Sequence, residues 1–261
     1  MALKVEDTPD GTWVVSGRGE LHLSILIERM RREGYELQVS RPQVILREEG
    51  GKVLAPFERV VIDVPDEHTG VVIQKLSSRN GVLQDMKSDS GVTALEFIIP
   101  TRGLFGYRNE FMTDTRGLGI MNVAFEGYEP DPGNWKERDK GSLVAHESGT
   151  TNLYGLLAVQ DRGTMFIGPA IAVYKGQVVG QNARAEDIRV NVCKEKRLSN
   201  MRSKGDGSAE HFATPHEMGL EDSLEYIGDD ELVEVTPKSV RIRKMVLDEN
   251  EQRRLERMGK A

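Results

Sequence analysis

The sequence contains a single cysteine, Cys193, among 261 residues. One cysteine excludes a disulfide within the chain and fits a reducing compartment, so we expect a cytoplasmic protein. No run of about 18 apolar residues occurs, and no basic stretch followed by an apolar core opens the sequence. A membrane-spanning helix and a secretion signal are therefore not expected.

Signatures of several enzyme classes are missing as well. The phosphate-binding motif G-x-x-x-x-G-K-[ST] does not occur, so we expect this chain not to bind GTP. The serine-nucleophile motif G-x-S-x-G is absent, and the histidines lack the paired spacing of metal ligands. His211 and His216 lie close together in the sequence, but we expect no metal there. We predict no catalytic residue, no metal and no cofactor on this chain.

Residues 1–50 show the pattern of part of an α/β sandwich. The runs ALKVEDT and TWVVSGRG favour strands and are separated by the turn-forming Pro9-Asp10-Gly11, which predicts a hairpin. Apolar residues spaced i, i+3, i+4 and i+7 before Gly34 predict a helix, and YELQVSRPQVILRE returns to strand-like residues. The glycines of SGRGE, residues 16–20, are interpreted as a strand-to-helix turn rather than a phosphate site. The order ββαβ predicts a partial ferredoxin-like domain.

Residues 51–130 show the complete version of this pattern. A strand in FERVVIDVP, a helix beginning near Thr69, a hairpin around Ser90-Gly91, a second helix and a last strand give the order βαββαβ. That order predicts a ferredoxin-like sandwich, in which two helices cover one face of an antiparallel sheet. The segment TRGLFGYRNEF leads into the second helix, and its Arg102 and Arg108 are candidate phosphate contacts.

Residues 131–261 predict a β-rich domain with one helix. The segment DPGNWKERDKG, residues 131–141, has the composition of a linker. Short runs with glycine between them follow, among them SLVAHES, TNLYGLLAVQ, GTMFIG, AIAVYKGQVVG and DIRVNVC, and we expect these to form strands. MGLEDSLEYIG predicts the helix, and ELVEV and VRIRK predict a closing hairpin. DENEQRRLERMGKA is a charged tail that is expected to be either helical or frayed. The predicted fold class is α+β throughout.

Charge is sorted unevenly along this last domain. The chain has a formal net charge of -7, yet five of the eleven residues 194–204, the basic segment, are Lys or Arg. Residues 206–235 then carry ten acids and no Lys or Arg. Cations with small polar neighbours are typical of contacts to RNA phosphate and ribose, although ordinary surface lysines and arginines are the alternative. We predict that RNA binds at Lys194, Lys196, Arg197, Asn200, Arg202, Ser203 and Lys204, with further phosphate contacts from Arg102, Arg108, Arg241, Arg243 and Lys244.

Long segments of the chain resemble a known family. VEDTPDGTWVVSGRGELHLSILIERMRREGYELQVSRPQVI resembles the third domain of translational GTPases of the elongation factor G group. The stretch from Phe57 to Pro130, with PTRGLFGYRNEFMTDTRGLG, is similar to their fifth domain. VQDRGTMFIG, KEKRLSNMRSKG and LEDSLEYIGDDELVEVTPKSVRIRK are similar to the C-terminal domain of the BipA/TypA family.

The resemblance implies a ribosome-associated protein. A complete family member would begin with a GTPase domain that binds GTP and Mg, so this chain is expected to be its C-terminal part, without GTPase activity of its own. The implied partners are both ribosomal subunits, rRNA, ribosomal proteins and A-site tRNA, with a role in 50S assembly and in stress or cold adaptation. In this family the basic segment would reach toward the acceptor end of A-site tRNA. We expect a monomer that does not bind membranes.

Two other functions remain open from the residues alone. Acylphosphatase-type enzymes share the ferredoxin-like fold, but they need an arginine-bearing phosphate loop where VPDEHTG, residues 64–70, offers two acids. A protein-interaction scaffold that uses the acidic stretch is the other alternative, and it is compatible with RNA binding.

Overall fold

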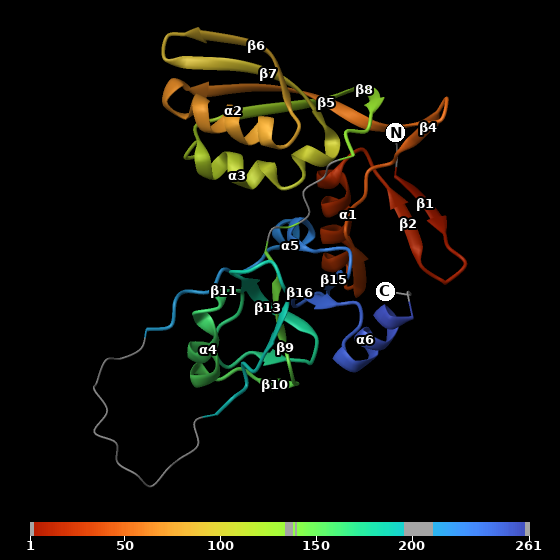
Figure 1. Ribbon diagram of the computed structural model, residues 1–261, viewed down its shortest axis with the longest axis vertical. Coiled ribbons are helices and arrows are strands. Elements are labelled where there is room, and N and C mark those ends of the chain that lie inside the picture. The colour runs from red at the N-terminus through yellow and green to blue at the C-terminus, as the bar shows by residue number, and fades with distance from the viewer. Residues whose placement is uncertain (1–2, 134–137, 139, 196–210, 259–261) are drawn as a thin grey trace. The chain divides into compact units, whose positions relative to one another are not determined.

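The computed structural model describes residues 3–133, 138, 140–195 and 211–258 (Figure 1). The chain folds into two compact units, residues 42–135, here the sandwich unit, and residues 1–41 with 136–261, here the main unit. Each contains helices and β-sheet, which confirms the predicted α+β class. No helix among the described residues is both long and apolar enough to cross a membrane.

From Lys52 onward the sandwich unit has the predicted order βαββαβ, and one short additional strand precedes it. Its sheet runs β4-β5-β7-β6, and β8 pairs with β5. The strands are β4 (Arg47–Glu49), β5 (Lys52–Pro65), β6 (Val82–Asp89), β7 (Val92–Pro100) and β8 (Ile120–Pro130). The helical elements are η1 (Asp66–His68), α2 (Thr69–Ser78), η2 (Thr101–Leu104) and α3 (Tyr107–Asp114).

Alternation along β5 explains why one face of this sheet is covered. Val60, Ile62 and Val64 are buried because they point to the face on which α2 and α3 lie side by side (Figure 1). On the opposite face, the Arg59 guanidinium binds Glu126 at 2.7 Å and also pairs with Glu96. The open face is therefore centred on a charged triad.

The main unit is built on a seven-stranded sheet in the order β14-β9-β13-β16-β15-β3, with β11 paired to β13. Its strands are β3 (Leu37–Ser40), β9 (Ser142–Ala145), β11 (Gly163–Met165), β13 (Gln177–Asn182), β14 (Ile188–Val190), β15 (Glu231–Val235) and β16 (Val240–Lys244). Two small hairpin-like pairs lie outside it, β1 (Lys4–Asp7) with β2 (Trp13–Ser16) and β10 (Gly149–Thr150) with β12 (Ala172–Val173).

The first segment of the chain shares this sheet. β3 pairs antiparallel with β15, so that Ser40 lies opposite Leu232 and Leu37 opposite Val235. The structure thus groups residues 1–41 with 136–261, which the sequence did not predict. The division into domains 1–50, 51–130 and 131–261 stays a prediction.

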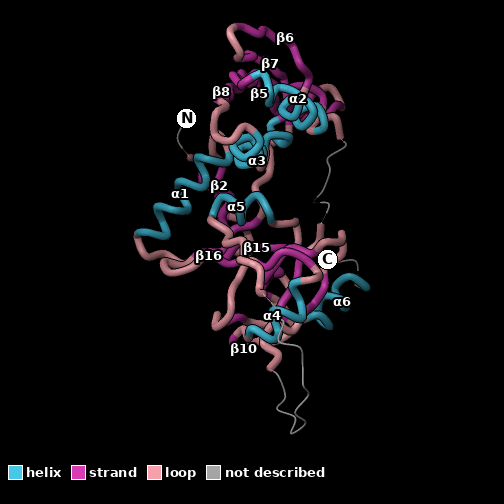
Figure 2. Tube along the Cα trace, turned by 90° about the vertical axis from the view of Figure 1, so that its left-hand side faces the viewer, coloured by secondary structure: helices cyan, strands magenta, loops and turns pink. Residues whose placement is uncertain are grey.

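Helices cover both faces of the main sheet. Helices α1 (Glu20–Arg32) and α5 (Leu220–Tyr226) pack on one face and α4 (Leu153–Gln160) on the other. Helix α6 (Glu249–Arg257) follows β16 in the chain. In β9, Leu143 and Ala145 belong to the core formed with α4, whereas Val144 belongs to the core formed with α1 and α5. Figure 2 shows the strands of this sheet between α5 and α4.

One segment forms a different type of secondary structure from the one predicted. TNLYGLLAVQ, expected as a strand, forms helix α4, and the predicted helix forms as α5. The run is apolar on nearly every side, so it has no period that separates a buried strand from a buried helix. Asn152 caps the start of this helix, because its Oδ1 accepts a hydrogen bond from the backbone N–H of Tyr154 at 2.9 Å.

Candidate nucleic-acid interface

The chain that leads into the basic segment is fixed on the first turn of α4. The backbone N–H of Asn152 donates to the carbonyl oxygen of Val192 at 2.9 Å. Gly155 faces the same stretch, and an added Cβ there would lie 2.6 Å from that carbonyl oxygen. A side chain at this position would separate the helix from the strand end, so glycine permits the close approach.

The first cation of the basic segment lies beside an exposed aromatic ring. Lys194 is exposed, and its Nζ lies 5.9 Å from the centroid of the Tyr154 ring. Tyr154 is 40% exposed and its neighbour Leu153 is 47% exposed. An accessible ring beside a cation is typical of surfaces that bind unpaired nucleotides, where a base stacks on the ring and a phosphate meets the charge.

The chain that follows the basic segment returns to the other end of the same helix. Gln160, the last residue of α4, donates from Nε2 to the carbonyl oxygen of His211 at 3.4 Å. Its Oε1 accepts from the backbone N–H of Ala213 at 3.3 Å, and Phe212 packs against the core beneath. Eight helical residues span about 12 Å, so the two flanks of the segment are held at opposite ends of α4.

The remaining predicted residues of the segment lie outside the described part of the chain. They are Lys196, Arg197, Asn200, Arg202, Ser203 and Lys204. Their contacts to RNA stay a prediction. The sequence did not single out Tyr154, because TNLYGLLAVQ was expected as a strand.

The two predicted phosphate contacts of the sandwich unit lie at the start of α3. Arg108 is exposed on that helix, and Arg102 is half-buried in η2. The turn between them is held by the Arg79 guanidinium, which donates to the carbonyl oxygens of Gly103 at 3.1 Å and Phe105 at 2.8 Å. These two arginines belong to a different unit from the basic segment.

The three candidates on β16 differ in accessibility. Arg241 is half-buried, 3.8 Å from Glu234. Arg243, also half-buried, donates to the carbonyl oxygens of Lys244 at 3.1 Å and Met245 at 3.3 Å. Lys244 was predicted as a surface phosphate contact, but it is only 3% exposed. That expectation is corrected, because its ammonium is occupied by carboxylates inside the protein.

Lys244 belongs to a buried cluster of charges centred on Glu231. The Glu231 carboxylate is fully buried, 2.9 Å from the Lys244 Nζ and 2.8 Å from the Arg138 guanidinium. Lys244 also pairs with Asp187 and with Asp230, the latter at 2.7 Å. Burial alone would raise the pKa of Glu231, but Lys244 and Arg138 outweigh it and lower the pKa to about 2. The cluster joins β15 and β16 to Arg138 of the segment predicted as a linker, which is a structural role.

The described residues bear on two kinds of chemistry, metal binding and a reactive thiol. They contain no group of three or more His, Cys, Asp or Glu placed to hold a metal ion. Burial, followed by the nearby Glu147 charge, raises the pKa of the Cys193 thiol, which disfavours the reactive thiolate.

Comparison with known proteins gives two adjoining family matches. Residues 140–249 match the family described as TypA/BipA C-terminal domain, and residues 52–139 match the family described as elongation factor G C-terminus. A Synechocystis protein is 49% identical over 247 residues, covering 94% of this chain and 41% of the relative. A Bacillus subtilis protein is 49% identical over 255 residues, covering 96% and 42%. An Escherichia coli K12 protein is 48% identical over 263 residues, covering 100% and 43%.

All three relatives are named large ribosomal subunit assembly factor BipA. The chain spans less than half the length of each of them, with coverage from 41% to 43%. The matched region is their C-terminal part.

Proposed function

Because this chain belongs to the TypA/BipA family and corresponds to the C-terminal part of its members, we propose that it is the ribosome-binding part of a factor that assembles the large ribosomal subunit. Its contribution is to bind RNA through the basic segment and the adjoining face of α4. GTP binding and hydrolysis, with Mg, belong to a region of the family outside this sequence. The chain works in the cytoplasm as a monomer.

The observation that carries this proposal is that α4 holds both flanks of the basic segment. Lys194, the first cation of the segment, lies beside the accessible ring of Tyr154. Lys and Arg supply the sequence-independent attraction to phosphate, while an aromatic ring supplies stacking that tolerates any base. The combination suits an unpaired RNA end, and in the intact factor we propose A-site tRNA and rRNA of both subunits as the partners.

Two rival functions are less consistent with the contacts. The loop that an acylphosphatase would need for phosphate carries Asp66 and Glu67, and Asp66 accepts a hydrogen bond from Ser88 at 3.1 Å. Negative charge there repels an anionic substrate. In the acidic stretch, Asp230 and Glu231 are committed to Lys244, so this part of the stretch stabilises the fold and is not free for a partner.

Binding of the purified chain to 50S subunits at several salt concentrations tests the proposal. A variant in which Lys194, Lys196, Arg197, Arg202 and Lys204 are all replaced by Gln should lose affinity, and its log-log salt slope should fall by roughly 3.5 to 4.5. In the control variant, five exposed cations elsewhere in the chain are replaced by Gln. They are Lys4, Arg29, Arg32, Lys52 and Lys87. Equal binding by wild type and the segment variant, or equal losses in the segment variant and the control, would contradict RNA binding by the segment.

A further inference from the structure

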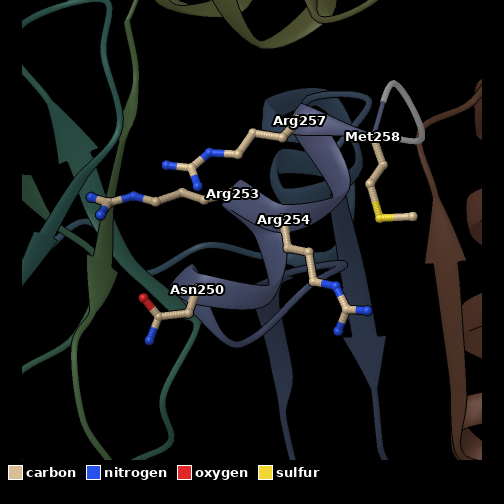
Figure 3. A pocket seen from close by; sticks show the side chains of 5 residues that line it. All are labelled: Asn250, Arg253, Arg254, Arg257 and Met258. Atoms are coloured by element: carbon tan, nitrogen blue, oxygen red, sulfur yellow. The ribbon is translucent and has the colours of Figure 1, made fainter.

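One face of the C-terminal helix α6 carries three arginines and no acid. Residues spaced i, i+3, i+4, i+7 and i+8 share one face of a helix. In α6 and the residue after it, these positions are Asn250, Arg253, Arg254, Arg257 and Met258. They line an open hollow of about 370 Å³ (Figure 3).

Asp248 and Glu249, at the start of the helix, attach it to the rest of the main unit. Asp248 caps α6, because its Oδ1 accepts from the backbone N–H of Asn250 at 2.8 Å, and it also pairs with Lys175. The hydrogen bond from Lys175, with those from the backbone, lowers the pKa of Asp248 to about 2. Arg189 donates to the carbonyl oxygen of Leu247 at 3.2 Å and lies 3.7 Å from Glu249. Asp248 is therefore held on the attachment side of the helix, whereas Glu249 lies between Arg189 and Arg253.

The guanidinium groups differ in how far they are engaged. Arg253 pairs with Glu249, one turn earlier. Within the described side chains, no acid lies within ion-pair distance of Arg254 or Arg257. Arg253 and Arg257 extend in the same direction from successive turns, and Arg254 extends to the other side of the hollow (Figure 3). The hollow is therefore bordered by positive charge on two sides.

We propose that this arginine face of α6 binds phosphodiester groups of RNA, as a contact separate from the basic segment. The inference rests on the proposed function, since it assigns a second part of the same RNA-binding protein. A guanidinium is a planar fork that can bind two phosphate oxygens at once, and side chains one turn apart lie about 5 to 6 Å from each other. Arg253 and Arg257 are thus placed for neighbouring phosphates of one strand.

RNA fits this face better than an acidic protein does. Stable protein interfaces are centred on apolar or aromatic anchors that are buried on binding. The only apolar side chain on the face is Met258, at its end, 54% exposed. Asn250 adds an amide that can donate to and accept from a ribose hydroxyl.

The test compares the R253Q/R254Q/R257Q variant of the full 261-residue chain with wild type. The probe is a fluorescein-labelled twelve-uridine RNA, and anisotropy is measured over a salt series. The log-log salt slope should fall by about 2, because three phosphates are no longer neutralised on a single strand. Gln retains good helix propensity, and circular dichroism checks that the variant folds. The matched control is K4Q/R29Q/R32Q, which removes the same charge from exposed sites of the main unit.

Four outcomes decide the inference. A slope reduced by about 2 in the α6 variant and not in the control supports it. An unchanged slope, with the basic-segment variant still losing affinity, overturns the α6 contact and leaves the proposed function standing. Failure of wild type to bind either the RNA or 50S subunits overturns both. A polyglutamate peptide could instead displace the labelled RNA from wild type as strongly as unlabelled RNA does, and fail to do so with the α6 variant. That result would assign the face to an acidic protein and overturn the inference.

Discussion

Replacing Glu231 by glutamine should destabilise the main unit by about 3 kcal/mol at neutral pH. Glutamine keeps the shape, and its carbonyl oxygen can accept from the Gly228 N–H, which donates to Oε2 of Glu231 at 2.9 Å. Its amide nitrogen can donate to the Ser142 hydroxyl, which binds Oε1 of Glu231 at 2.6 Å. What disappears is the negative charge between Lys244 and Arg138. Breaking one partner of a buried ion pair costs about 3 to 5 kcal/mol. The pKa of Glu231, lowered from 4.5 to about 2, corresponds to a similar value, about 3 kcal/mol.

The pH dependence gives this prediction a second signature. The folded-state pKa is below the unfolded value, so the contribution of Glu231 is complete above pH 4.5 and is lost as the pH falls toward about 2. The difference between wild type and Glu231→Gln should therefore shrink steadily as the pH falls from about 5 to 3.

Urea unfolding measures the difference, with amide exchange of β15 and β16 as the local readout, because two units can unfold separately. Glu217→Gln, at an exposed acid of the same unit, is the control and should change stability by less than about 0.5 kcal/mol. A loss below about 1 kcal/mol for Glu231→Gln, or a loss that does not vary with pH, would refute the assignment. The Glu231→Gln/Lys244→Met pair should lose less than the sum of its single variants, since one interaction is removed twice.

Three further predictions concern other parts of the main unit. Burial, followed by the charges of two glutamates of α5, raises the pKa of Glu20 to about 7. Because this folded-state pKa is above the unfolded value, the free energy of unfolding should decline as the pH rises from about 4.5 to 7. Glu20→Gln should remove that decline and exceed wild type by at most about 3 kcal/mol at pH 8 in urea unfolding. Tyr154→Ala should weaken binding of a twelve-uridine RNA by about 5- to 150-fold, whereas Tyr154→Phe keeps the ring and most of the affinity, as measured by anisotropy; equal losses in both would exclude stacking. Gly155→Ala should lower the unfolding free energy by about 1 to 3 kcal/mol, because its Cβ meets the Val192 carbonyl and overpacking outweighs the better helix propensity; a melting temperature at or above that of wild type would contradict this close contact.

Local patterns explain which elements were predictable. The helix at α1 and the order βαββαβ follow from apolar spacing and turn residues that lie within a few positions of each other. In VRIRK, period two places Lys244 on the same face as Val240 and Ile242, so its burial could have been predicted from alternation. Its acidic partners could not, because they come from other elements.

Nonlocal features were beyond the sequence patterns. The pairing of β3 with β15 joins residues far apart in the chain, and no local signal in either strand names its partner. Tyr154, the aromatic residue of the candidate interface, was not predicted because the segment that forms α4 was expected to be a strand. The only local feature that indicates a helix there is the capping residue Asn152. The arginine face of α6, by contrast, is readable from the spacing of its residues once the tail is taken as a helix.

The place of β3 in the main sheet has a consequence for synthesis of the chain. Ser40 and Leu232 are opposite each other in the sheet yet about 190 residues apart, so a ribosome making roughly 5 to 20 residues per second needs ~10 to 40 seconds to bring out the second strand after the first. Residues 42–135 are complete well before then, and their longest-range strand pairing, from Leu54 to Pro130, lies within the unit. The sandwich unit should therefore fold first on the nascent chain, and β3 stays unpaired until β15 has been synthesised. The slow step of folding is then the pairing of the last hairpin with a strand made about 190 residues earlier.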